Sequence, residues 1–191
     1  DVNPSRGLGD VYKRQPWHPH RGFETVTYLL DGRMQHEDSA GNSGELNPGD
    51  VQWMTAGRGI IHSEEPHDEF RRTGGRTHGF QIWVNLPAEH KMMAPRYQEI
   101  PSEESPTVYQ EGVWARVIAG ECMGQKSSIS TIIPIKLIHV RMNPDSVLSQ
   151  EIESDLNSMI YVFRGKIVID NQLEVRDHPL PRGLGVSQQV R

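Results

Sequence analysis

Two short motifs contain the residues of this chain that are best suited to hold a metal ion. His18 and His20 are separated by one residue, as are His62 and Glu64. On a β-strand this spacing places both side chains of a motif on the same face. If the two strands face each other, three imidazoles and one carboxylate converge. Such a set suits a divalent transition metal and leaves coordination positions open for a substrate or dioxygen.

The chemistry of this donor set narrows the choice of metal and substrate. Neutral imidazoles with one carboxylate suit Fe(II), Mn(II), Ni(II), Cu(II) or Zn(II). Around a doubly charged ion, the single carboxylate of Glu64 leaves a net charge of +1. That charge favours an anionic or enolate-like substrate. If Glu64 detached from the metal, its carboxylate could also accept a proton.

Other acidic and histidine residues compete for the same role. Glu24 lies four residues after His20 and shares its face if the strand is regular, so it is a rival ligand, but a bulge at Gly22 would turn it away. His36 and Asp38 also have the one-residue spacing, but their polar neighbours favour a supporting or surface role. The remaining histidines have no partner at ligand spacing: His67, His78, His90, His139 and His178.

The sequence around the motifs predicts the strands that must position them. Residues 24–30 alternate between apolar and polar side chains, which indicates a half-buried strand. Asp31-Gly32 follows, and this pair is typical of a type I′ hairpin turn leading into a return strand at 33–38. Further strands are predicted at 51–55, at 60–62 after a glycine-rich bend, and at 80–86.

A second block of predicted strands follows a polar, proline-containing segment at 95–112, which we interpret as a linker. Residues 113–119, 129–142 and 159–163 are rich in β-branched and aromatic side chains. A turn at 164–166 leads into a strand at 167–170. The shared strand–turn–strand form suggests two related β-barrels. The second block lacks a His-x-His motif, so we expect no matching metal site there.

Composition excludes several classes of protein. The chain of 191 residues has a net charge of −5 and a pI near 6.0, which argues against a general nucleic-acid binder. Its small basic run at 71–76 is expected to be a solvated, glycine-rich loop. The single cysteine, Cys122, excludes an intrachain disulfide and fits a cytoplasmic protein. No apolar run approaches the roughly 18 residues of a membrane helix.

The longest motifs of the chain resemble the pirin family of the cupin superfamily. The resemblance rests on residues 18–28 and 49–64, and residues 112–120 look like the pirin segment that opens the second domain. It implies an all-β bicupin with the metal held only in the N-terminal barrel. In that family, two histidines of the first motif and the histidine and glutamate of the second bind iron. They correspond here to His18, His20, His62 and Glu64.

The resemblance also implies a domain organisation. We expect a metal-binding cupin domain at 16–94, the linker at 95–112 and a partial C-terminal cupin domain at 113–191. Residues 1–15 are predicted to be a non-native or disordered leader, and the chain is interpreted as a fragment truncated at both ends.

Two functions follow from the resemblance. The first is a flavonol (quercetin) 2,3-dioxygenase that uses dioxygen to open the ring of an enolic aromatic substrate, with Glu64 as the catalytic base. The alternative is an iron- or redox-dependent regulatory protein that binds a transcription factor or a metabolic enzyme. Neither function requires direct contact with nucleic acid or a membrane.

Overall fold

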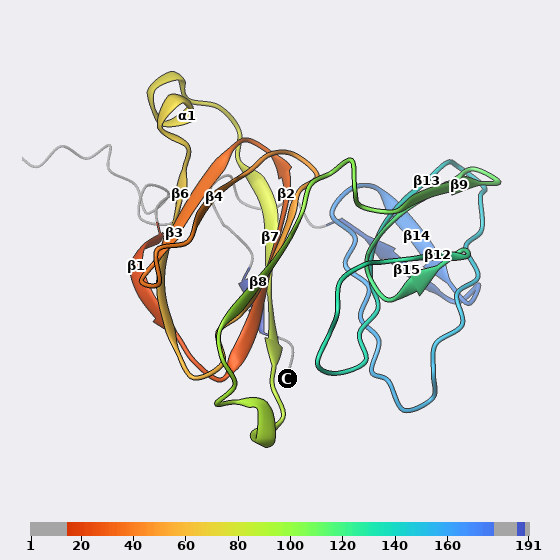
Figure 1. Ribbon diagram of the computed structural model, residues 1–191. Coiled ribbons are helices and arrows are strands. Elements are labelled where there is room, and N and C mark those ends of the chain that lie inside the picture. Colours follow the sequence, from red (N-terminus) through yellow and green to blue (C-terminus); the bar gives the residue numbers. More distant parts are fainter. Residues whose placement is uncertain (1–14, 178–186, 190–191) are drawn as a thin grey trace, which may run out of the picture.

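The computed structural model of the protein describes residues 15–177 and 187–189. The leader predicted at 1–15 therefore lies, apart from Gln15, outside the described residues. The all-β prediction is confirmed, because strands dominate the described chain and helix is limited to two short segments. Figure 1 shows two groups of strands side by side: an N-terminal unit in red to green, joined by the blue strand at 187–189, and a second unit in green to blue.

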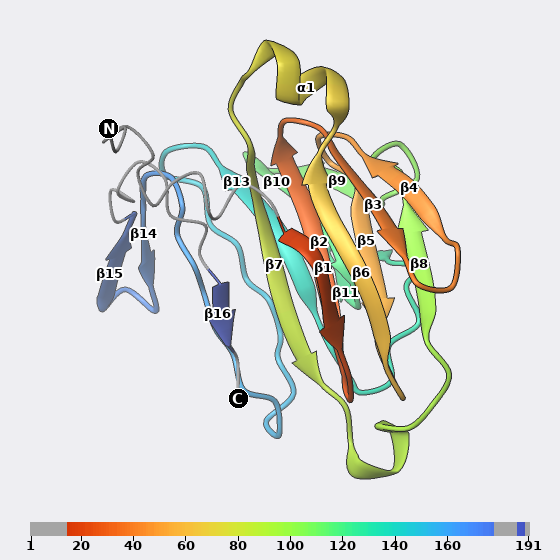
Figure 2. The same ribbon diagram turned by 90° about the vertical axis from the view of Figure 1, so that its left-hand side faces the viewer.

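Two facing sheets form the N-terminal unit, and Figure 2 shows their strands along their length. Thr27 of one sheet donates a hydrogen bond to Glu64 of the other, so polar side chains meet in the space between them. The first sheet contains, in order, β1 (Gln15–His20), β6 (Ile60–Pro66), β3 (Met34–Asp38) and β4 (Ser43–Leu46). The second contains β16 (Ser187–Gln189), β7 (His78–Asn85), β2 (Phe23–Asp31), β5 (Val51–Thr55) and β8 (Arg96–Ile100).

The hairpin predicted at Asp31-Gly32 is wrong, although the strands on either side of it exist. β2 pairs with β5 and β7, whereas β3 pairs with β4 and β6. Gly32 has a positive φ of 93° and Asp31 does not, so the type I′ conformation is not formed. The chain uses this turn to cross from one sheet to the other, which a local turn signal does not distinguish from a hairpin.

The central strand β2 presents different chemistry on its two faces. Thr25 and Thr27 face the other sheet of the N-terminal unit. Val26 and Tyr28 face the second unit, where they join a buried cluster that includes Ile118 of that unit. Val26 is 0% exposed, so the contact between the two units excludes water at this strand.

The second unit is built on a three-stranded sheet ordered β13 (Leu137–Met142), β10 (Val113–Ala119) and β9 (Thr107–Gln110). Two separate hairpins accompany it: β11 (Glu121–Cys122) with β12 (Gln125–Lys126), and β14 (Lys166–Ile169) with β15 (Leu173–Arg176). In the described residues these strands do not close into a barrel.

Three predictions outside the N-terminal strands need correction. The expected linker at 95–112 contains β8 and β9, which pair with β5 and β10, so only 101–106 connects the two sheets. Residues 159–163 are not a strand, because Met159 and Ile160 find no partner strand and stay exposed. The basic run predicted as a loop partly forms the helix α1 (Asp68–Thr73), while the other helical turn is η2 (Ala88–His90).

Among the described residues, no helix has the length and apolar character needed to span a membrane.

Candidate metal centre

The pairing of β1 with β6 brings the two predicted motifs together. The strands are antiparallel, and His18 lies directly opposite His62. The Nε2 atoms of His18 and His20 are 2.9 Å apart, and those of His18 and His62 are 3.1 Å apart. His20 and His62 are buried, whereas His18 is partly exposed. Three imidazoles therefore converge on one point. The partly exposed His18 lies between this point and the protein surface.

Burial keeps two of these imidazoles neutral. Burial, together with the neighbouring His18, lowers the pKa of His20 to about 4. Burial and the adjacent histidines lower the pKa of His62 to about 3. A neutral imidazole carries the free lone pair that a metal ion requires.

The spacing of the three nitrogens fits a shared metal ion. Imidazole nitrogens bind zinc at about 2.0–2.1 Å, so two such ligands at right angles lie about 3 Å apart. The two measured Nε2 separations have this value. Among the described residues, the candidate ligand atoms of these three histidines all lie within 4.8 Å of one another.

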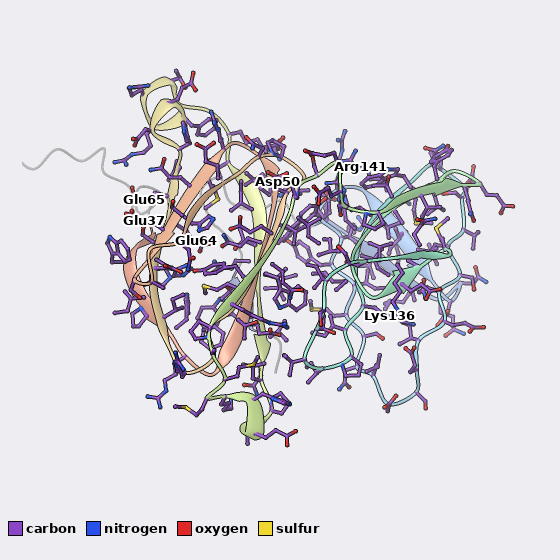
Figure 3. The ribbon with its side chains drawn as sticks, in the orientation of Figure 1. Glu37, Asp50, Glu64, Glu65, Lys136 and Arg141 are labelled. Carbon is purple, nitrogen blue, oxygen red and sulfur yellow. The ribbon has the colours of Figure 1, made fainter. Side chains whose placement is uncertain are left out.

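Glu64 lies beside the three histidines with its carboxylate turned to other partners. It follows His62 by two residues on β6 and is buried. Its oxygens accept hydrogen bonds from the Thr27 hydroxyl, at 3.0 Å, and from the Gln81 side-chain amide. In Figure 3, Glu64 lies within the N-terminal unit, whereas its neighbour Glu65 lies at the outer edge. Burial raises the pKa of Glu64, and the two hydrogen bonds oppose that shift.

The rival ligand Glu24 lies on the opposite face of β2. Glu24 and Val26 are alternate residues of β2, so they share a face, and Glu24 is fully buried. Its carboxylate accepts a 2.6 Å hydrogen bond from the Thr55 hydroxyl. The cause is the bend between β1 and β2, where Gly22 has a φ of 78°. This bend breaks the alternation that would have aligned Glu24 with His20.

His36 and Asp38 are buried and have structural partners. The Nε2 atom of His36 lies 2.8 Å from a carboxylate oxygen of Glu99, across the gap between the two sheets. Asp38 accepts hydrogen bonds from the backbone N–H groups of Ala40 and Asn42, which closes the turn between β3 and β4. Neither residue has the surface position considered from the sequence.

Four residues of this centre were missed by sequence reasoning. Thr27 and Gln81 hold Glu64, and the rings of Phe23 and Trp83 pack against His20 at centroid distances of 5.0 and 5.6 Å. The register of β2 with β7 places Thr27 opposite Gln81 and Thr25 opposite Trp83. The alternation of each strand indicates which side chains share a face, but the pairing of the strands was needed to bring them together.

The histidines without a predicted partner do not join the centre. His67, His78, His90 and His139 lie in other parts of the structure, and His178 lies outside the described residues.

Comparison with known proteins supports a specific family. A family model described as Pirin matches residues 3–84, a range that includes most of the predicted leader. Human Pirin is 46% identical over 180 residues, which cover 92% of this chain and 60% of the human protein. Mouse Pirin is also 46% identical, over 85% of this chain and 56% of the mouse protein. The chain thus spans less than two thirds of these relatives.

Two solved structures share the fold and are about one third identical to this chain in sequence. GK1651 from Geobacillus kaustophilus aligns with a TM-score of 0.76 and 33% identity, over 92% of this chain and 74% of that one. Quercetin 2,3-dioxygenase from Acinetobacter baumannii aligns with a TM-score of 0.70 and 34% identity, over 84% of this chain and 57% of that one.

Proposed function

The chain belongs to the pirin family of the cupin superfamily, and on this premise we propose that it is a metal-dependent oxygenase of the quercetin 2,3-dioxygenase type. The observation that carries the proposal is the convergence of three imidazole nitrogens at about 3 Å separations. The similarity to the Acinetobacter baumannii quercetin 2,3-dioxygenase supports the choice of reaction. The proposed substrate is a flavonol-like enolic aromatic compound, with dioxygen as co-substrate.

His18, His20 and His62 would hold the metal. Glu64, which lies outside their cluster with its carboxylate hydrogen-bonded to Thr27 and Gln81, would turn toward them as the fourth ligand. Iron is the proposed metal, and Mn, Ni, Cu and Zn suit the same donor set. A bound ferrous ion would supply the redox chemistry and the positive charge that oxygenation of an enolate requires.

The remaining roles belong to the chain's own side chains. Glu64 is the proposed base, with a carboxylate oxygen accepting the proton of the substrate's acidic hydroxyl. Thr27 and Gln81 orient that carboxylate through their hydrogen bonds. Phe23 and Trp83 fix the ring of His20 by packing against it, which limits its rotation.

Metal analysis followed by anaerobic addition of quercetin tests the proposal. We expect bound iron, a change in the absorption spectrum of quercetin on binding, and turnover once oxygen is admitted. Bound iron without a spectral change or turnover would favour the alternative, an iron- or redox-dependent regulatory protein. Full turnover by metal-free protein would contradict the metal-dependent mechanism.

Two matched glutamate variants test the assignment of the base. Glu64→Gln is expected to lose quercetin turnover while it retains iron through the three histidines. Glu24→Gln makes the same change to another buried carboxyl, on the opposite face of β2, and is expected to retain both iron and turnover. Equal loss of turnover in the two variants would indicate a general effect on folding instead.

A further inference from the structure

A small polar hollow lies at the contact between the two units, on the face of β2 that points away from the metal centre. Its volume is about 170 Å³. Tyr28, Leu30, Pro48 and Gly49 line it from the N-terminal unit. Trp114, Arg116 and Arg141 line it from the second unit. These residues define what we call the interdomain hollow.

The register of the second sheet explains why cationic groups gather there. Trp114 lies opposite Arg141, and Arg116 lies opposite His139. Because alternate residues of a strand share a face, these four side chains project from the same face of the β10–β13 pair. Farther along that face, Ile118 and Leu137 pack into the apolar cluster between the units. The face is therefore apolar at one end and cationic at the other.

Neither arginine of the interdomain hollow has a carboxylate partner among the described residues. In the described ranges, no ion pair involves Arg116 or Arg141. Both guanidinium groups lie over the ring of Trp114, at 5.7 Å for Arg116 and 4.7 Å for Arg141. The nearby Asp50 is already engaged, because its carboxylate accepts hydrogen bonds from the backbone N–H groups of Asn47 and Ser102.

The hollow is built from fixed groups. Arg116 donates a 2.6 Å hydrogen bond to the carbonyl oxygen of Gly49, while its buried Nε has no hydrogen-bond partner among the described residues. A Cβ atom on Gly49 would lie 2.4 Å from Nη1 of Arg116, so only glycine allows this approach. The phenol of Tyr28 and Nδ1 of His139 are 2.7 Å apart and join the two units beside the hollow.

We propose that the interdomain hollow binds a small oxyanion, a carboxylate or a phosphate, between Arg116 and Arg141. Guanidinium groups pair with both anions through parallel hydrogen bonds. The volume is below the roughly 300–1,000 Å³ of pockets for drug-sized ligands, so the ligand is smaller than a flavonol. The site is separate from the metal centre and uses none of its residues.

Calorimetric titration with inorganic phosphate and, separately, with acetate tests this site at constant ionic strength. The wild-type chain is expected to bind at least one of the two anions saturably at a single site, and the tighter one identifies the chemistry. Arg141→Gln should weaken this binding about tenfold or more, as expected for the loss of a hydrogen bond to a charged group. Arg141 is exposed, so its replacement does not disturb the core.

Arg164→Gln is the matched control, because it removes the same charge from an exposed arginine of the second unit that does not line the hollow. It is expected to bind the anion like the wild type. Equal affinity in the wild type and Arg141→Gln would overturn the proposal, since it would place the anion at the metal centre or elsewhere. Absence of saturable binding for both anions would also overturn it.

Discussion

The two units of this bicupin use buried histidine in different ways. In the N-terminal unit, three imidazoles from two paired strands point at one another. In the second unit, the buried imidazole of His139 instead contacts the phenol of Tyr28. Both environments lower the pKa of the ring through burial. A buried neutral imidazole is therefore insufficient for a metal site, and the register between two strands supplies what the second unit lacks.

The largest effect is expected when that convergence is broken. His62→Ala removes the buried imidazole opposite His18 and should lower iron affinity by more than about 100-fold. Loss of a residue that only hydrogen-bonds to a metal ligand usually lowers metal affinity by about 10- to 100-fold, and loss of a ligand itself should cost more. Turnover of quercetin should disappear with the metal. Metal analysis and oxygen uptake measure both effects. His90→Ala, which alters a 43% exposed side chain, is the control and should leave both unchanged.

The next effect concerns the apolar contact that joins the units. Trp53 is 0% exposed and belongs to the cluster shared by both, so Trp53→Ala should lower the free energy of unfolding by about 3–5 kcal/mol. Urea denaturation measures this difference. Tyr109→Ala removes an aromatic ring that is 63% exposed on the second unit and should cost far less. Similar costs for the two variants would show that the contact between the units contributes little.

The pH dependence of stability distinguishes His139 from an ordinary histidine. Burial lowers its pKa from 6.5 to about 4, helped by the charges of Arg141 and Arg116, while Tyr28 and Trp114 also face the ring. Between these two pH values the unfolded chain binds a proton that the folded chain does not. The contribution of His139 to the free energy of unfolding is therefore fully present above about pH 6.5. It is lost as the pH drops toward 4, which lowers the free energy of unfolding by roughly 3 kcal/mol.

His139→Gln tests this dependence, because glutamine does not titrate in this range and can still hydrogen-bond to Tyr28. The difference in unfolding free energy between the variant and the wild type should change across pH 4–6.5. A constant difference over that range would contradict a neutral buried His139. The metal-centre histidines are present in both proteins and cancel in the comparison.

The smallest effect compares two valines. Val26 of β2 is fully buried, whereas Val168 of the β14–β15 hairpin is 58% exposed. Val26→Thr buries a hydroxyl group and should cost about 1–3 kcal/mol, while Val168→Thr should change stability by less than about 0.5 kcal/mol. Thermal unfolding distinguishes these values. An equal cost at both positions would mean that Val168 is covered in solution.

The sequence predicts the N-terminal unit better than the second one. Apolar and polar side chains alternate regularly at 24–30 and 80–86, which is typical of strands, and β2 and β7 are found there. The pairing of strands depends on contacts distant in sequence, so the turn at Asp31-Gly32 was misread as a hairpin. In the second unit, the apolar run at 129–142 contains only one strand from 137 onward, because its earlier residues pack against the N-terminal unit without pairing.

For the candidate site, the one-residue spacing predicts that His18 and His20 share a face of β1, since this depends only on strand geometry. The pairing of β1 with β6 then brings His62 to them. The position of Glu24 depended on one glycine conformation, which alternation alone could not settle. The partners of Glu64 come from β2 and β7, strands of the facing sheet, and only the tertiary structure shows that they meet.

One consequence follows from the alternation of β2. Thr27 contacts Glu64 beside the metal centre, and the next residue, Tyr28, lines the interdomain hollow on the other side of the sheet. Adjacent residues of β2 therefore contact the two candidate sites, one on each face of the sheet. The nuclear magnetic resonance signal of the Tyr28 amide is placed to report occupancy of either one, so one labelled atom could follow two ligands in a single titration.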